Sequence, residues 1–142
     1  MDHFNRTEIR MSFEAVLDKL VTSLQREGFV ISGITDFHEF NSKSEIAHGK
    51  YKVLSVYLPA LYKELMTLCP YDGAILPSYV SVIETYPGQI SVVPYSPDGT
   101  IIEMQNGSFQ SLRAEVAKRL NLAVSALEPK QVKDPDLVTS WS

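Results

Sequence analysis

The sequence predicts an α+β fold in which a single mixed or mostly antiparallel sheet packs against two main helices and a C-terminal helix. Apolar residues at helical spacing occur in three separate segments, and segments typical of β-strands lie between them. Two of these strand segments are joined by Pro87-Gly88, a dipeptide typical of tight turns. The 142 residues are enough for one domain with its own core.

The first helix is the most clearly marked element. Residues 7–11 read as a short edge strand, and Ser12 follows as a helix cap, because its hydroxyl can accept a hydrogen bond from an N–H of the first turn. Gly28 ends the helix, since glycine tolerates the left-handed conformation often found there. The buried stripe is predicted to consist of Phe13, Val16, Leu17, Leu20 and Leu24.

Two strands are predicted next, at residues 29–34 and 52–57. Residues 35–46 between them fit either a short helix or an irregular loop. The later strand is apolar on both faces, which indicates a central position in the sheet. Its alternation places Val53, Ser55 and Tyr57 on one face and Leu54 and Val56 on the other.

A middle helix begins at Pro59, because the N–H that proline lacks has no partner in a first helical turn. Pro70 ends this helix. The only cysteine lies on its apolar stripe, which is formed by Leu58, Leu61, Tyr62, Leu65, Met66 and Cys69.

A hairpin and a last helix complete the predicted domain. Residues 75–86 and 89–95 are the two hairpin strands, with Pro87-Gly88 at the centre of a type II turn, and residues 100–104 are a candidate for a further short strand. Ser108 is expected to cap the last helix. Its core stripe is Phe109, Leu112, Val116, Leu120, Val124 and Leu127. Residues 1–129 are therefore expected to form one domain, followed by a polar tail at residues 130–142.

The charge balance argues against nucleic acid as a partner. The formal net charge is -4, whereas a general phosphate-backbone binder needs a basic face. The densest basic group, Arg113, Lys118 and Arg119, is interpreted as a solvated helix face. No cysteine or histidine spacing indicates a metal site, and no cofactor is expected. The N-terminus lacks the apolar segment of a signal peptide and no stretch suits a membrane span, so a cytoplasmic protein is expected.

Several short motifs resemble the domain-of-unknown-function family numbered 302 over about two thirds of the chain, from Phe13 to Pro97. They are Glu27-Gly28-Phe29, residues 34–38, Leu65-Met66, Pro70, Leu76-Pro77, the strand ending in Glu84, and residues 93–97. The resemblance implies a compact α+β domain, often dimeric, with no assigned activity. Some relatives carry a Cys or a Gly-Asn pair before the proline that opens the middle helix. Tyr57 and Leu58 occupy those positions here, so no chemistry is carried over from them.

The titratable residues give only weak signals of a catalytic site. Cys69 lies at a predicted helix C-terminus, where the helix dipole disfavours a thiolate, so it is interpreted as a core residue. Glu84 shares a strand face with two valines and would have to be paired, hydrogen-bonded or protonated if that face is buried. His38 could act as an acid or base together with Asp36 or Glu84. His38 and His48 could also form a base or metal pair with Glu39 or Glu45, but their separation gives no fixed helical or strand geometry.

Tyrosines are the other candidates, because they combine apolar area with a polar tip and suit ligand pockets and dimer interfaces. The candidate ligand-binding residues are His38, Tyr57, Tyr79, Glu84 and Tyr95. We expect a homodimeric module that binds a small molecule or a partner without catalysis. The alternative is a small enzyme that uses His38 with Glu84 or Asp36 as acid and base.

Overall fold

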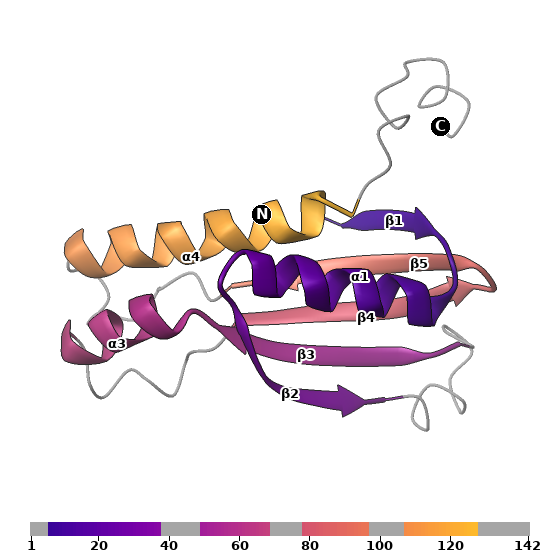
Figure 1. Cartoon of the computed structure of the whole chain (residues 1–142), viewed down its shortest axis with the longest axis horizontal. Coiled ribbons are helices and arrows are strands. Elements are labelled where there is room, and N and C mark those ends of the chain that lie inside the picture. The colour runs from indigo at the N-terminus through magenta and orange to yellow at the C-terminus, as the bar shows by residue number, and fades with distance from the viewer. Residues whose placement is uncertain (1–5, 38–48, 69–77, 97–106, 128–142) are drawn as a thin grey trace, which may run out of the picture.

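The computed structural model describes residues 6–37, 49–68, 78–96 and 107–127, and their strands form one sheet (Figure 1). The strands are β1 (Thr7–Arg10), β2 (Val30–Asp36), β3 (Tyr51–Tyr57), β4 (Ser78–Tyr86) and β5 (Gln89–Tyr95). Their order in the sheet is β1-β5-β4-β3-β2, and every neighbouring pair is antiparallel. The predicted α+β fold is confirmed, and β3 has a neighbour on each side as expected.

The helices α1 (Phe13–Arg26), α3 (Pro59–Leu68) and α4 (Gly107–Ser125) contribute to one layer on one side of this sheet (Figure 1). Ser12 caps α1 as predicted, and its Oγ accepts a hydrogen bond of 3.1 Å from the backbone N–H of Ala15. The chain leaves α1 through Gly28, whose φ of +96° is the left-handed conformation that glycine tolerates.

The core lies between the helices and the facing side of the sheet. Every second residue of β3, β4 and β5 points into it, as the strand period requires. The buried apolar side chains are Ile9, Phe13, Val16, Leu20, Leu24, Phe29, Leu54, Val56, Leu58, Val80, Val82, Ile90, Val92, Val116, Leu120, Ala123, Val124 and Leu127. Leu17, which the helical period assigned to the stripe, packs at its margin and is only partly buried.

Two contacts join the beginning of the chain to later segments. The backbone N–H of Met11 donates to the carbonyl of Gly88 over 3.0 Å, and Gly88 has the positive φ of +79° expected in the hairpin turn. The buried hydroxyl of Ser23 on α1 donates to the carbonyl of Ala123 on α4 over 2.6 Å. The first and last helices are therefore tied directly to each other.

Three details differ from the sequence-based expectation. β2 extends to Asp36, and its register with β3 shifts between Ile31 and Gly33, which leaves Ser32 as an extra residue in a β-bulge. The helix α4 begins at Gly107, so Ser108 lies within it and not at the cap. Arg113 belongs to the buried face of α4, with 4% of its surface exposed, so the interpretation of a fully solvated basic face was wrong at this residue.

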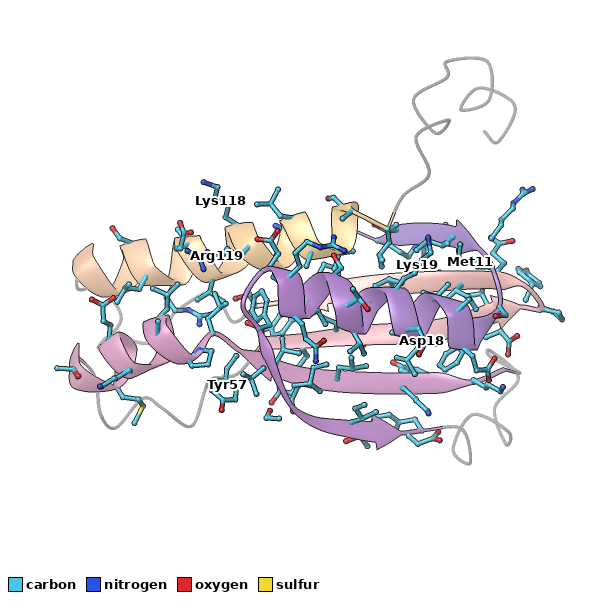
Figure 2. All side chains as sticks on the ribbon, in the orientation of Figure 1. Met11, Asp18, Lys19, Tyr57, Lys118 and Arg119 are labelled. Atoms are coloured by element: carbon cyan, nitrogen blue, oxygen red, sulfur yellow. The ribbon has the colours of Figure 1, made fainter. Side chains whose placement is uncertain are left out.

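The hydroxyl of Ser96, at the end of β5, explains part of this burial, because it accepts a hydrogen bond of 3.2 Å from the Arg113 guanidinium. Lys118 is exposed and projects from α4, and Arg119 forms an ion pair with Glu115 at 2.9 Å (Figure 2). Cys69, His38, His48, the loop question at residues 38–46, the strand candidate at 100–104 and the tail lie outside the described residues.

Candidate functional site

Three of the predicted ligand-binding residues lie on the side of the sheet opposite the helices, which we call the open face. Tyr79 and Tyr95 are direct partners in the β4–β5 register. Tyr57 lies at the end of β3 (Figure 2), two residues beyond Ser55, the cross-strand partner of Tyr79. Tyr57 and Tyr79 are thus diagonal neighbours, within reach of each other for aromatic side chains. We refer to Tyr57, Tyr79 and Tyr95 as the tyrosine patch.

The patch is accessible to solvent. Tyr79 is 39% exposed and Tyr95 is 49% exposed, while Tyr57 is half-buried. None of the described helices or strands covers the open face, because α1, α3 and α4 contribute to the core on the other side (Figure 1). Large exposed side chains gathered on one surface are typical of a binding site.

The open face is uncharged over the described residues of four strands. The residues of β2 to β5 that alternate onto it are tyrosine, serine, threonine, valine, isoleucine, glycine and glutamine. Charge enters only on β1, through Glu8 and Arg10. There Glu8 accepts hydrogen bonds from Gln89 at 2.8 Å and Ser91 at 2.9 Å and pairs with Arg6.

Small side chains lie beside the tyrosines. Ser55 is bordered along β3 and across to the neighbouring strands by Val53, Tyr57, Gly33 and Tyr79. Its hydroxyl is 2.8 Å from the hydroxyl of Ser32, whose Oγ also donates to the Ser55 carbonyl over 3.1 Å. The bulge in β2 is thus hydrogen-bonded to the centre of the open face. The alternation of β3 already placed Ser55 beside Tyr57, but only the strand order places Gly33 and Tyr79 there.

Glu84 lies away from the tyrosine patch, at the opposite end of β4 and on the side that carries Val80 and Val82. Its carboxylate accepts a hydrogen bond of 3.2 Å from the backbone N–H of Lys50, and its own N–H donates to the Lys50 carbonyl over 2.8 Å. These two hydrogen bonds of Glu84 connect β4 to the residue that precedes β3. A shallow pocket of about 140 Å³ beside it is lined by Gly49, Glu84, Thr85, Tyr86 and Pro87.

Of the residues predicted as acid–base partners, the structure describes Asp36 and Glu84 but not His38. Asp36 ends β2 and is the cross-strand partner of Lys52, and it is not among the described residues that line the Glu84 pocket. His38 lies outside the described residues, so its combination with either carboxylate stays a prediction. Within the described ranges, no group of three or more His, Cys, Asp or Glu side chains is arranged to hold a metal ion.

A second depression lies in the helix layer. It has a volume of about 270 Å³ between α1 and the residues that follow α4, and among its lining residues are Asp18 and Lys19, which project from α1 (Figure 2). Both charge signs border it, so it provides no single electrostatic preference. None of the helices in the described part of the chain is long and apolar enough to cross a membrane.

Comparison with known proteins identifies the family. The chain matches the model of "Domain of unknown function DUF302" over residues 5–127. It is also similar to a solved structure described as an uncharacterized conserved protein DUF302 from Bacillus stearothermophilus, with a TM-score of 0.73 and 17% sequence identity. That similarity covers 88% of this chain and 98% of the other and supports the fold. No curated protein matches the chain. The chain belongs to the DUF302 family, as its motifs suggested.

Proposed function

We propose that this DUF302 protein is a homodimeric binding module without catalysis, which takes an uncharged small molecule on the tyrosine patch. The observation that carries the proposal is the position of Tyr57, Tyr79 and Tyr95 as neighbours on an uncharged sheet face. The fold supplies a firm base, because the side chains on the other face of β3, β4 and β5 include the buried core residues Leu54, Val56, Val80, Val82, Ile90 and Val92.

The chemistry of the patch favours a neutral molecule with a flat ring. Tyrosine rings offer flat apolar surfaces, and their hydroxyls can donate and accept hydrogen bonds. Ser55 and Ser81 add small hydroxyl groups on the same face. A charged ligand would find no opposite charge on β2 to β5 of this face to offset the loss of its hydration.

The site has no catalytic assignment for Glu84 in this proposal. A general base must lie within hydrogen-bond reach of the proton that it takes from the substrate. Glu84 lies at the entry of β3, where its Oε1 accepts a hydrogen bond from the backbone N–H of Lys50. A substrate on the tyrosine patch would also lie on the opposite face of the sheet from this carboxylate.

The test is an NMR titration of the full chain with glucose, adenosine and indole, three neutral ring compounds of different polarity. We expect at least one to shift the amide signals of Ser55, Tyr79 and Tyr95. Tyr79→Ser or Tyr95→Ser should weaken that binding about five- to tenfold, because an aromatic contact is lost.

Tyr86→Ser is the matched control, since Tyr86 lies on the same strand β4 and is 68% exposed but lies at the hairpin turn. It should leave the affinity unchanged. Shifts that gather around Glu84, or no shifts with any of the three compounds, would contradict the assignment of the tyrosine patch.

A further inference from the structure

The two edges of the sheet are built differently. The β1 edge is four residues long, and exposed Glu8 and Arg10 alternate with buried Thr7 and Ile9. The β2 edge is seven residues long, and its only charged residue is Asp36 at the end. Short length and charges along the strand protect a sheet edge against pairing with another chain, whereas β2 is longer than β1 and is uncharged before Asp36.

β2 carries an exposed apolar side chain on each side of the sheet. Val30 is 41% exposed and is the partner of Tyr57, so it belongs to the open face. Ile34 is 50% exposed and is the partner of buried Leu54, so it belongs to the side of the helices. Apolar residues on both faces are typical of a strand inside a sheet and not of one at its edge.

The backbone of β2 also offers hydrogen-bonding groups outward. The N–H of Phe37 donates to the carbonyl of Tyr51 over 2.8 Å, so Phe37 points its backbone toward β3. Antiparallel ladders alternate, and therefore the N–H and C=O of Ile34 point away from β3. No described element lies beyond β2 to receive them (Figure 1).

We propose that β2 is the dimer seam, where a second copy of the chain adds its own β2 antiparallel and extends the sheet across a two-fold axis at Ile34. This inference rests on the homodimer of the proposed function and gives it a surface. A two-fold axis at Ile34 pairs this residue with its own equivalent, as an isologous interface requires. The outward N–H and C=O groups of the two Ile34 residues then bond to each other.

The charges of β2 fit this self-pairing. With Ile34 on the axis, Asp36 lies opposite Ser32 of the partner subunit and not opposite its own equivalent. Four residue steps separate the two Asp36 positions, roughly 14 Å along extended strands. This exceeds the screening length of about 8 Å at physiological salt, so the like charges do not oppose pairing. The bulge at Ser32 interrupts the regular ladder, so Ile34 lies within the uninterrupted segment from Gly33 to Asp36.

The first test uses disulfide trapping in a Cys69→Ser background, so that the introduced thiol is the only one. Ile34→Cys should form a covalent dimer on mild oxidation, because a hydrogen-bonded pair on the two-fold axis brings its Cα atoms to about 5.5 Å, within the range that a disulfide spans. Thr35→Cys is the matched control, since Thr35 lies opposite Gly33 of the partner subunit in this register. It should cross-link at least tenfold more slowly.

The second test measures mass by light scattering across protein concentrations. The native chain should be a dimer, and Ile34→Lys should shift it to monomer with an unchanged circular dichroism spectrum, whereas Thr35→Lys on the same strand should keep more of the dimer. A native chain that is monomeric at 1 mM would overturn the proposed seam. So would a dimer that persists in Ile34→Lys, if Ile34→Cys also fails to form the cross-link.

These outcomes are separable from those of the ligand proposal. If Ile34→Lys is monomeric and still shows ligand shifts at Tyr79, both the seam and the ligand site stand. If the native chain is monomeric and binds at Tyr79, the homodimer and its seam fail together while the ligand site stands. If the chain is a dimer that survives Ile34→Lys without Ile34→Cys cross-linking, the seam fails while the homodimer stands. If the chain dimerises through β2 and no compound shifts Tyr79, the ligand site fails alone.

Discussion

The two faces of the sheet use the same strands and the same backbone hydrogen bonds, yet their side chains differ completely. On the helix side, Leu54, Val80 and Val82 have no exposed surface. On the open side, the next residues along the same strands include Tyr79, of which 39% is exposed, and Ser81, which is half-buried. Because side chains alternate in a strand, stability and binding can be altered separately, one residue apart.

The largest expected effect that separates the faces is on the free energy of unfolding. Leu54→Ala should lower it by about 2–5 kcal/mol, because it removes buried methyl groups and leaves a cavity. Ser81→Ala introduces the same residue type on the open face of β4. It should change the free energy of unfolding by no more than about 0.5 kcal/mol. Urea denaturation followed by circular dichroism measures both. Equal losses in the two variants would mean that the open face is also packed.

A smaller effect concerns two glycines, one near each face. A Cβ at Gly49 would lie 2.7 Å from both the Cβ and the carbonyl oxygen of Glu84, so the backbone would have to move. Gly49→Ala should therefore cost about 1–3 kcal/mol of unfolding free energy. At Gly33 on the open face, the nearest atom is the Ser55 hydroxyl at 3.3 Å, which can rotate away.

Gly33→Ala should accordingly cost less than Gly49→Ala in the same urea experiment. The reverse order of the two losses would show that the backbone at the bulge of β2 is more rigid than the backbone at the entry of β3.

The smallest effect is expected for the exposed pair of Glu14 and Lys50, at the margin of the helix side. The hydrogen bond with Lys50 lowers the pKa of Glu14, and the bond with Glu14 raises the pKa of Lys50. The stabilisation from Glu14 is present above its ordinary pKa of 4.5 and is lost as the pH falls through the lowered value. The stabilisation from Lys50 is lost only as the pH rises through its value above 10.5.

Glu14→Gln should therefore reduce the slope of stability against pH as the pH falls below about 4.5, by a small amount because both side chains are exposed. Urea midpoints measured over that range give the slope, and 1 M salt should reduce the difference between the two proteins. A slope that is unaffected by the substitution at low salt would show that the pair contributes nothing.

The fold was predictable wherever a local rule decides the structure. The helical period with the Ser12 cap predicted α1, the dipeptide Pro87-Gly88 predicted the hairpin, and alternation assigned the two faces of β3. The bulge at Ser32 was not predictable, because it appears only in the register of β2 against β3, where the Ser32 hydroxyl meets that of Ser55. Glu84 could be predicted to need a hydrogen bond, but not that the donor is the backbone of Lys50, far away in the sequence.

Arg113 is instructive because the pattern did contain the signal. It lies three residues before Val116 and seven before Leu120, which places it on the buried stripe of α4. Composition led to the opposite interpretation, since arginine is rarely buried. The tyrosines were proposed for their chemistry, but their position as neighbours follows from the strand order, which joins β3, β4 and β5 and which no local pattern predicts.

The hydrogen bond between Ser23 and Ala123 has a consequence for how the protein is made. The two bonded residues are 100 positions apart in the sequence. Strand β1 also gains its neighbour in the sheet only after β5 has been synthesised. A ribosome that adds about 5–20 residues per second needs roughly 5–20 s to pass from one partner to the other. During that interval the apolar side of α1 has no completed core, so the emerging chain depends on protection from aggregation until its last helix arrives.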